Sequence, residues 1–148
     1  MHADTTQVRV NAQSGRACIM ENEIENKINF RLSQSREKLE LAAIMLEKGM
    51  YNDSVLCSYL SMFYSVRVLL IQNGSDSDDH DRILELVESY YEPAGWTGVD
   101  IIGILREAKT CRDSVESVRD AVATREEAEK FYTNAKMLHA TIAEKFSA

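Results

Sequence analysis

One segment in the middle of the chain, residues 53–73, carries apolar side chains on two adjacent faces of a predicted helix. The first stripe consists of Val55, Tyr59, Met62, Val66 and Leu69, and the second of Leu56, Leu60, Phe63 and Leu70. A third face carries only small hydroxyl side chains: Ser54, Ser58, Ser61 and Ser65. Such a helix must be nearly surrounded by other helices, and its serines allow one partner to approach closely. That partner is either part of the same chain or a second copy.

Four further segments carry a single apolar face, with gaps of three, four or seven residues. They are residues 21–48, a shorter helix through residues 83–91, residues 100–122, and a last helix after residue 124. Gly49 and Gly74 supply stops, Asn52 or Asp53 an N-cap, and Thr124 with Glu127 a capping box. The fold class expected is therefore all-α. It is an up-down antiparallel bundle of four long helices plus a shorter fifth.

The chain length and the apolar content fit one ordinary domain. With 148 residues and 45% hydrophobic side chains, the chain can bury a sizeable core without disulfides or metals. We expect this domain to span residues 21–148, after a flexible arm or upstream extension at residues 1–20, which is polar and lacks helical periodicity.

The cysteines and the apolar runs predict a soluble cytoplasmic protein. Cys18, Cys57 and Cys111 are odd in number and form no CxxC pair, which is typical of reduced thiols. Cys57 and Cys111 fall in apolar helical patterns and are expected to be buried. The longest apolar run, residues 41–46, has six residues and is far too short for a membrane span.

The charge distribution limits where a polyanion could bind. The formal net charge is −7, so no general electrostatic footprint for nucleic acid exists. Residues 76–92 hold seven acidic side chains and one arginine, a net charge of −6. The run Asp78, Asp79, His80 and Asp81 contains potential ligands for a divalent cation, but acidic residues at a helix start are ordinarily explained by the helix dipole. We therefore predict no metal and no cofactor.

A polar cluster on the predicted fourth helix is the main candidate for chemistry. Arg112 and Glu116 are one turn apart, as are Asp113 and Ser117, while Arg119 lies two turns beyond Arg112. Two arginines on one side of a helix could hold phosphate oxygens. The competing interpretation is an ion pair on a solvated face, which contributes only a few tenths of a kcal/mol.

Several segments together resemble the HEPN family, the higher-eukaryote and prokaryote nucleotide-binding domain. Residues 59–74, YLSMFYSVRVLLIQNG, resemble its second-helix signature, and residues 46–54, LEKGMYNDS, resemble the turn before that helix. Residues 79–84, DHDRIL, resemble a segment where members often carry a histidine. Arg112 and the later residues 126–129, EEAE, resemble the closing motif and last helix.

The resemblance implies a helical bundle that usually forms a homodimer with a polar cleft at its two-fold axis. Many members are metal-independent ribonucleases, and many are toxins paired with a small nucleotidyltransferase antitoxin. In the nucleases, an arginine, the polar residue after it and a histidine separated from the arginine by four to six residues form the site. Arg112 and Asp113 match the first two positions.

The motif histidine is missing from this sequence. Its window holds Ser117, Val118 and Arg119 instead. Cleavage of RNA through its own 2′-hydroxyl needs a general base and a general acid, which serine and valine do not supply near neutral pH. Asp113 or Glu116 would serve as a base only if desolvation raised its pKa. His80 is the other candidate, although its acidic segment should favour the charged form.

Two function hypotheses remain after these observations. In the first, the protein binds RNA or nucleotide through Arg112, Asp113, Glu116, Ser117, Arg119, His80 and Tyr59, as one half of a toxin-antitoxin or defence-type pair. Ribonuclease activity is doubtful in this hypothesis because the histidine is absent. In the second, the protein is a non-catalytic homodimeric interaction or adaptor module.

Overall fold

The computed structural model describes the backbone of residues 12–91 and 99–146, and the side chains of residues 21–91 and 99–146. Five helices make up most of these ranges: α2 (Ala12–Glu47), α3 (Tyr51–Gln72), α4 (His80–Tyr90), α5 (Ile101–Ser117) and α6 (Arg125–Phe146). No strand occurs in the described ranges. The expected class, an all-α bundle of four long helices and a shorter fifth, is confirmed, and α4 is the short helix.

Helix α3 is the centre of the bundle, as its two apolar stripes predict. It contacts α2, α4, α5 and α6, and its side chains from both stripes contribute to the core. By length and composition α3 could cross a membrane, but 72% of its most apolar window is buried inside the protein. The high apolar content of α3 therefore reflects its central place in the bundle.

The serine face of α3 packs against α2 of the same chain, which answers the question that the sequence left open. Ser54 Oγ donates to the carbonyl of Ala42 at 2.9 Å. Ser35 Oγ lies 2.9 Å from Ser61 Oγ and 2.6 Å from Ser65 Oγ, and all three serines are fully buried. Small side chains let the two helix backbones approach, and the hydroxyls of Ser35, Ser61 and Ser65 bond to one another there, whereas the buried hydroxyl of Ser58 has no hydrogen-bond partner within the described ranges.

The ends of α4 and α6 follow the local sequence signals. Asp79 caps α4 by accepting from the backbone N–H groups of Asp81 at 3.0 Å and Arg82 at 3.3 Å. The Thr124 and Glu127 capping box forms as predicted, with reciprocal bonds of 2.9 and 3.1 Å. Glycines at the ends of α2 and α3 adopt left-handed φ angles of +75° and +73°.

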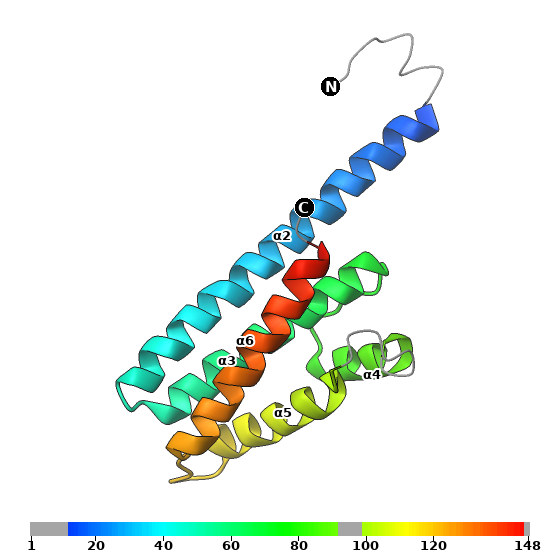
Figure 1. The fold of residues 1–148 in the computed structure, drawn as a ribbon. Helices are drawn as coiled ribbons and strands as arrows, with labels where there is room; N and C mark the ends of the chain where they lie inside the picture. The colour runs from blue at the N-terminus through cyan, green and yellow to red at the C-terminus, as the bar shows by residue number, and fades with distance from the viewer. Residues whose placement is uncertain (1–11, 92–98, 147–148) are drawn as a thin grey trace.

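Two helix starts differ from the prediction. Helix α2 begins at Ala12 rather than near residue 21, because residues 12–20 contain enough good helix formers to extend an existing helix at little cost. The N-terminal part of α2 extends past the other helices (Figure 1). The division at residue 20 stays a prediction, and residues 1–11 and the side chain of Cys18 lie outside the described parts.

Helix α3 begins at Tyr51, so neither Asn52 nor Asp53 is its N-cap. The amide of Asn52 instead holds the α5–α6 connection. Its Nδ2 donates to the carbonyl of Ala121 at 3.0 Å, and its Oδ1 accepts from the N–H of Ala123 at 2.7 Å.

The predicted extension of the fourth helix to Val122 is wrong. Helix α5 ends at Ser117, Val118 is extended, and Asp120 adopts a left-handed φ of +65°. Val118 and Val122 are 56% and 76% exposed, so their regular spacing did not mark a buried face. The bond network of Asn52 fixes this turn from a distant part of the sequence.

Candidate functional site

A tyrosine and a histidine from different helices meet where α3, α4 and α5 come together. Tyr59, in the middle of α3, lies with its hydroxyl oxygen 2.5 Å from Nδ1 of His80, the first residue of α4. The His80 ring also stacks on Phe63 of α3, with 4.5 Å between ring centroids and 26° between planes. The histidine is thus held in a fixed orientation by two α3 side chains one turn apart.

Arg112 of α5 also contacts the ring of the same tyrosine. Its guanidinium carbon is 5.0 Å from the centre of the Tyr59 ring, a cation–π distance. The guanidinium pairs with Glu116 at 2.9 Å and Asp113 at 3.2 Å, and the arginine side chain is 27% exposed. The ion pair predicted between Arg112 and Glu116 therefore forms, but the arginine lies on the aromatic core and does not project freely into solvent.

Lys109 also belongs to this cluster, and sequence reasoning missed it. Its ammonium is 3.0 Å from Asp113 and 3.6 Å from Asp81, so it joins α5 to the start of α4. The spacing of four residues between Lys109 and Asp113 was the only available signal. Phe63 was assigned to the core, where it is, but its stacking on His80 could not be foreseen.

The pKa values of His80 and Tyr59 both favour the neutral form. Burial lowers the pKa of His80, and the positive charges of Arg112, Lys109 and Arg67 lower it further, against a smaller opposite effect of Asp79. The expectation that the acidic segment favours a charged His80 is therefore wrong, because nearby cations and desolvation outweigh the acids. Burial raises the pKa of Tyr59, so its phenol stays protonated.

Asp113 is poorly suited to act as a general base. The hydrogen bond from Lys109 is the main reason that its pKa lies below the usual value, with a further contribution from Arg112. The condition that desolvation raise this pKa is not met, because the carboxylate is largely solvated and paired with cations. Asp113 therefore holds Arg112 and Lys109 in place as a carboxylate.

The two remaining predicted site residues lie at the end of α5. Ser117 is the last helical residue, and its hydroxyl donates to the carbonyl of Asp113. Arg119 follows the helix end, so the prediction that it shares a helical face with Arg112 is wrong. Of the predicted residues, the structure brings together Tyr59, His80, Arg112, Asp113 and Glu116.

The acidic start of α4 has a structural explanation. Asp79 uses its carboxylate to cap the helix, and Asp81 faces Lys109. Across the described ranges, no three His, Cys, Asp or Glu side chains are grouped so that they could hold a metal ion.

A second histidine lies in a different cluster between α2, α3 and α6. Nδ1 of His139 is 2.8 Å from Ser35 Oγ, which also contacts Ser61 and Ser65. Burial lowers the pKa of His139, and Arg36 lowers it further. Because Ser35 is fully buried, this Ser–His pair is closed to a substrate and serves the packing of three helices.

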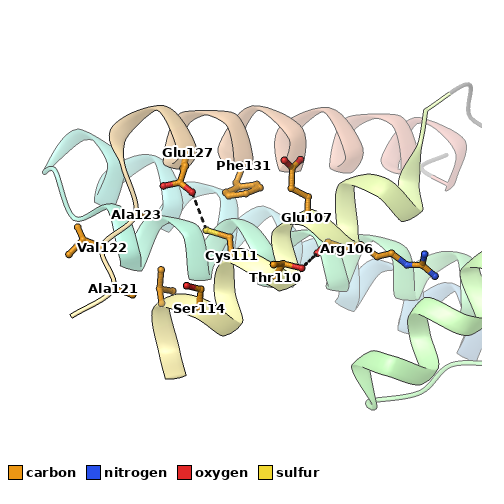
Figure 2. A pocket seen from close by; sticks show the side chains of 11 residues that line it. Arg106, Glu107, Thr110, Cys111, Ser114, Ala121, Val122, Ala123, Glu127 and Phe131 are labelled. Carbon is orange, nitrogen blue, oxygen red and sulfur yellow. Dashed lines mark hydrogen bonds between the residues drawn. The ribbon is translucent and has the colours of Figure 1, made fainter. Parts of the chain in front are cut away.

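A pocket of about 520 Å³ lies between α5, the α5–α6 connection and α6 (Figure 2). Cys111 lines it, with its sulfur 4.0 Å from a carboxylate oxygen of Glu127. Cys57 and Cys111 are half-buried rather than buried as expected. Burial raises the pKa of the Cys111 thiol, followed by Glu127 and Glu107, which disfavours a reactive thiolate. This pocket does not include Arg112 or His80.

The fold and the cluster define a class of protein: an all-α bundle in which aromatic side chains of the central helix contact an arginine and a histidine from two neighbouring helices. The model of the HEPN domain matches residues 28–145, and the chain belongs to this family. The family is generally related to nucleotides or RNA, and its domains commonly form dimers.

One curated relative is the UPF0332 protein PH1297 of Pyrococcus horikoshii. It is 24% identical to this chain over 74 residues, which cover 50% of the chain and 52% of the relative. The matched region thus spans about half the length of that relative.

Proposed function

We propose that this HEPN-domain protein binds RNA or nucleotide through a phosphate contact at Arg112 and His80, without cleaving it. The observation that carries the proposal is the hydrogen bond between Tyr59 and His80 beneath the Arg112 guanidinium. This arrangement presents two nitrogen donors, one charged and one neutral, at the junction of three helices.

The hydrogen bond determines which nitrogen of His80 carries the proton. Tyr59 is fully buried and its pKa is raised, so its O–H is the donor and Nδ1 of His80 accepts. A neutral imidazole then carries its proton on Nε2. Nε2 has no hydrogen-bond partner within residues 21–91 and 99–146, and it is available to donate to a ligand oxygen.

Arg112 can exchange a carboxylate for a phosphate without losing its position. Its contact with the Tyr59 ring and its pair with Asp113 hold the guanidinium, while Glu116, which is 46% exposed, can turn toward solvent. Arginine binds phosphate in the same forked geometry as it binds carboxylate. The contact should be weak and sensitive to salt, because Asp81, Asp113 and Glu116 outnumber Lys109 and Arg112.

The same geometry argues against the family's nuclease chemistry. The lone pair of His80 Nδ1 is occupied by Tyr59, and Nε2 carries a proton, so the neutral ring has no free basic nitrogen. Asp113 has a lowered pKa, and the histidine window after Arg112 contains no histidine. We infer that the protein binds RNA and cleaves it either not at all or very slowly.

We further propose that the protein acts as a cytoplasmic homodimer and that a small nucleotidyltransferase is its partner in a toxin-antitoxin or defence-type pair. The family's tendency to dimerise and the sequence resemblance support this part. Light scattering of the purified protein tests the dimer, and co-expression with a nucleotidyltransferase encoded beside it tests the pair.

Fluorescence anisotropy with a labelled single-stranded RNA tests the phosphate contact. Arg112→Ala should raise the dissociation constant about tenfold, since a hydrogen bond to a charged group contributes 1.5–3 kcal/mol in typical cases. The matched control is Arg106→Ala, which removes one arginine of the same helix whose side chain is 57% exposed and pairs with Glu88. Equal affinities for the two variants would contradict the proposal.

A second candidate function is the non-catalytic interaction module. It is favoured by the excess of carboxylates around Arg112 and by the acidic residues 76–92. In that case RNA should leave the melting temperature unchanged, and stabilisation by RNA that Arg112→Ala abolishes would exclude it.

A further inference from the structure

A second hollow lies far along α3 from the Arg112 cluster, between α2 and the end of α3. It encloses about 420 Å³, and its lining residues are Ile24, Lys27, Phe30, Arg31, Ile71, Gly74 and Asp76. The hollow thus combines two cationic side chains, an aromatic ring and apolar walls. This combination is unusual in a chain with a net charge of −7.

Arg31 has a positive charge that no carboxylate neutralises directly. Its only hydrogen bond goes to the neutral amide oxygen of Gln34 at 2.7 Å, and it makes no ion pair within the described ranges. Its guanidinium carbon lies 5.3 Å from the Phe30 ring centre and 6.0 Å from that of Tyr64. The acid of the hollow, Asp76, is already bound by Arg67.

The ion pair between Arg67 and Asp76 uses both carboxylate oxygens of Asp76. Arg67 Nε and Nη2 donate to them at 2.9 and 3.1 Å. Burial is the main reason that the pKa of Arg31 lies below its ordinary value; the charge of Arg67 lowers it further, and Asp76 acts in the opposite direction. The charged residues that line the hollow, Lys27 and Arg31 against Asp76, leave an excess of one positive charge, and Arg67 adds a further cation beside Asp76, so an anion would relieve the repulsion among the cations.

One face of α3 connects this hollow to the Arg112 cluster. Tyr59, Phe63 and Arg67 are spaced by four residues and so follow one another along the helix, over about 12 Å. Arg112 lies on Tyr59, His80 stacks on Phe63, and Arg67 binds the acid that lines the hollow. Tyr59 and Phe63 are themselves buried, so the polar groups along this face that a ligand could reach are Arg112, His80 and the side chains of the hollow.

We propose that the hollow is a second contact for a single-stranded RNA that also contacts Arg112, with Arg31 and Lys27 binding a backbone phosphate and Phe30 stacking on a base. Alternating cations and aromatic rings are the usual means of binding a single strand without sequence preference. Phe30 is 56% exposed, so its ring face is open to a base. The inference rests on the proposed function and extends it from a phosphate contact to an extended strand.

Anisotropy titrations with an oligouridylate of about eight nucleotides and with a dinucleotide test this path. Arg31→Ala and Phe30→Ala should each weaken binding of the longer RNA about fivefold to tenfold and leave the dinucleotide at Arg112 unaffected. The plot of log association constant against log salt concentration has a negative slope. Arg31→Ala should make that slope shallower by about 0.7, as expected for the loss of one phosphate contact to a single strand. The matched control, Arg36→Ala, removes one exposed arginine of the same helix and should change neither value.

The outcomes separate the inference from the proposed function. If Arg112→Ala weakens the longer RNA while Arg31→Ala and Phe30→Ala do not, the second contact is wrong and the proposed function stands. If RNA does not bind at all, both are wrong. Weakened binding by Arg31→Ala with an unchanged salt slope would also overturn the inference, because Arg31 would then not contact a phosphate. Binding of an acidic peptide in place of RNA would assign the hollow to a protein partner.

Discussion

The two histidines that lie within the helical bundle have opposite surroundings. His139 contacts Ser35, which in turn contacts two serines of α3, so it lies among neutral hydroxyl groups at a closed helix interface. His80 lies between the rings of Tyr59 and Phe63, with cations nearby. The pKa of each is lowered mainly by burial.

Both rings are partly exposed, and the difference between them is the set of groups around each ring: two aromatic rings and several cations at His80, and serine hydroxyls with one cation, Arg36, at His139. The hydrogen bonds of the serine cluster are used within the protein, so the cluster can only stabilise the fold. The cluster around His80 leaves Nε2 without a partner in the described ranges and places a guanidinium beside it. A lowered pKa therefore does not distinguish the two histidines, and the case for His80 rests on the aromatic rings and the arginine that meet around it.

The largest effect should come from enlarging a side chain in the closed cluster. Ser65→Leu adds volume where α2 and α3 are in direct contact, and it should cost about 3 kcal/mol of unfolding free energy. Ser117→Leu, the same change at the exposed end of α5, should cost less than about 0.5 kcal/mol. Urea titrations measure both. Similar costs would mean that the serine face is not a tight helix interface.

A smaller loss of unfolding free energy is expected when the central hydroxyl of the closed serine cluster, that of Ser35, is removed. Ser35→Ala leaves His139 and the α3 serines without their shared partner, and should cost about 2 kcal/mol. RNA affinity should be unchanged at temperatures where the variant is folded. Ser33→Ala, at an exposed position of the same helix, is the control and should have no measurable effect. A reduced RNA affinity of Ser35→Ala would show that the two clusters are not independent.

Removing the Tyr59 hydroxyl, which orients His80, should lower the stability less than Ser35→Ala does and should weaken RNA binding more. Tyr59→Phe keeps the ring beneath Arg112 but deletes the donor to Nδ1, at a cost of about 1 kcal/mol. RNA binding should weaken, because the proton of His80 is no longer confined to Nε2. Tyr132→Phe is the control, and chemical denaturation with anisotropy measures both properties. Unchanged affinity would mean that the tautomer of His80 is irrelevant to binding.

The smallest effect is a dependence of stability on pH. Both histidines have folded-state pKa values below the ordinary 6.5, so the unfolded chain binds protons more readily than the folded chain. The contribution of the two histidines to stability is complete above about pH 6.5. It is lost as the pH falls from there through their lowered folded-state pKa values. His80→Gln and His139→Gln should each flatten the unfolding free energy between pH 7 and about 5. A steeper profile in either variant would contradict the direction of the shift.

Much of the fold could be predicted because its signals are local. The capping box at Thr124 and the double apolar stripe of α3 predicted a helix start and a central helix correctly. The end of α5 could not be predicted, because Val118 and Val122 continue the apolar spacing. The turn there is fixed by Asn52, which contacts residues about seventy positions away.

Part of the residue cluster could be identified from the sequence, but its geometry could not, and whether the cluster is a binding site stays a prediction. Tyr59, His80 and Arg112 were identified separately, from a helix signature, an acidic segment and a polar cluster. Their meeting depends on how α4 and α5 pack against α3, which no spacing within one segment encodes. For the same reason the directions of the pKa shifts of His80 and Asp113 were not foreseen, since Lys109 and Arg112 act across helices.

The most direct test of the central claim follows the ring nitrogens of both histidines by NMR during titration with a single-stranded RNA. If Arg112 and His80 form the phosphate contact, the Nε2 signal of His80 should shift with saturable dependence on RNA, while the signals of His139 stay in place. The shift should vanish in Arg112→Ala and persist in Arg106→Ala. A stationary His80 signal at RNA concentrations that saturate binding would contradict the account.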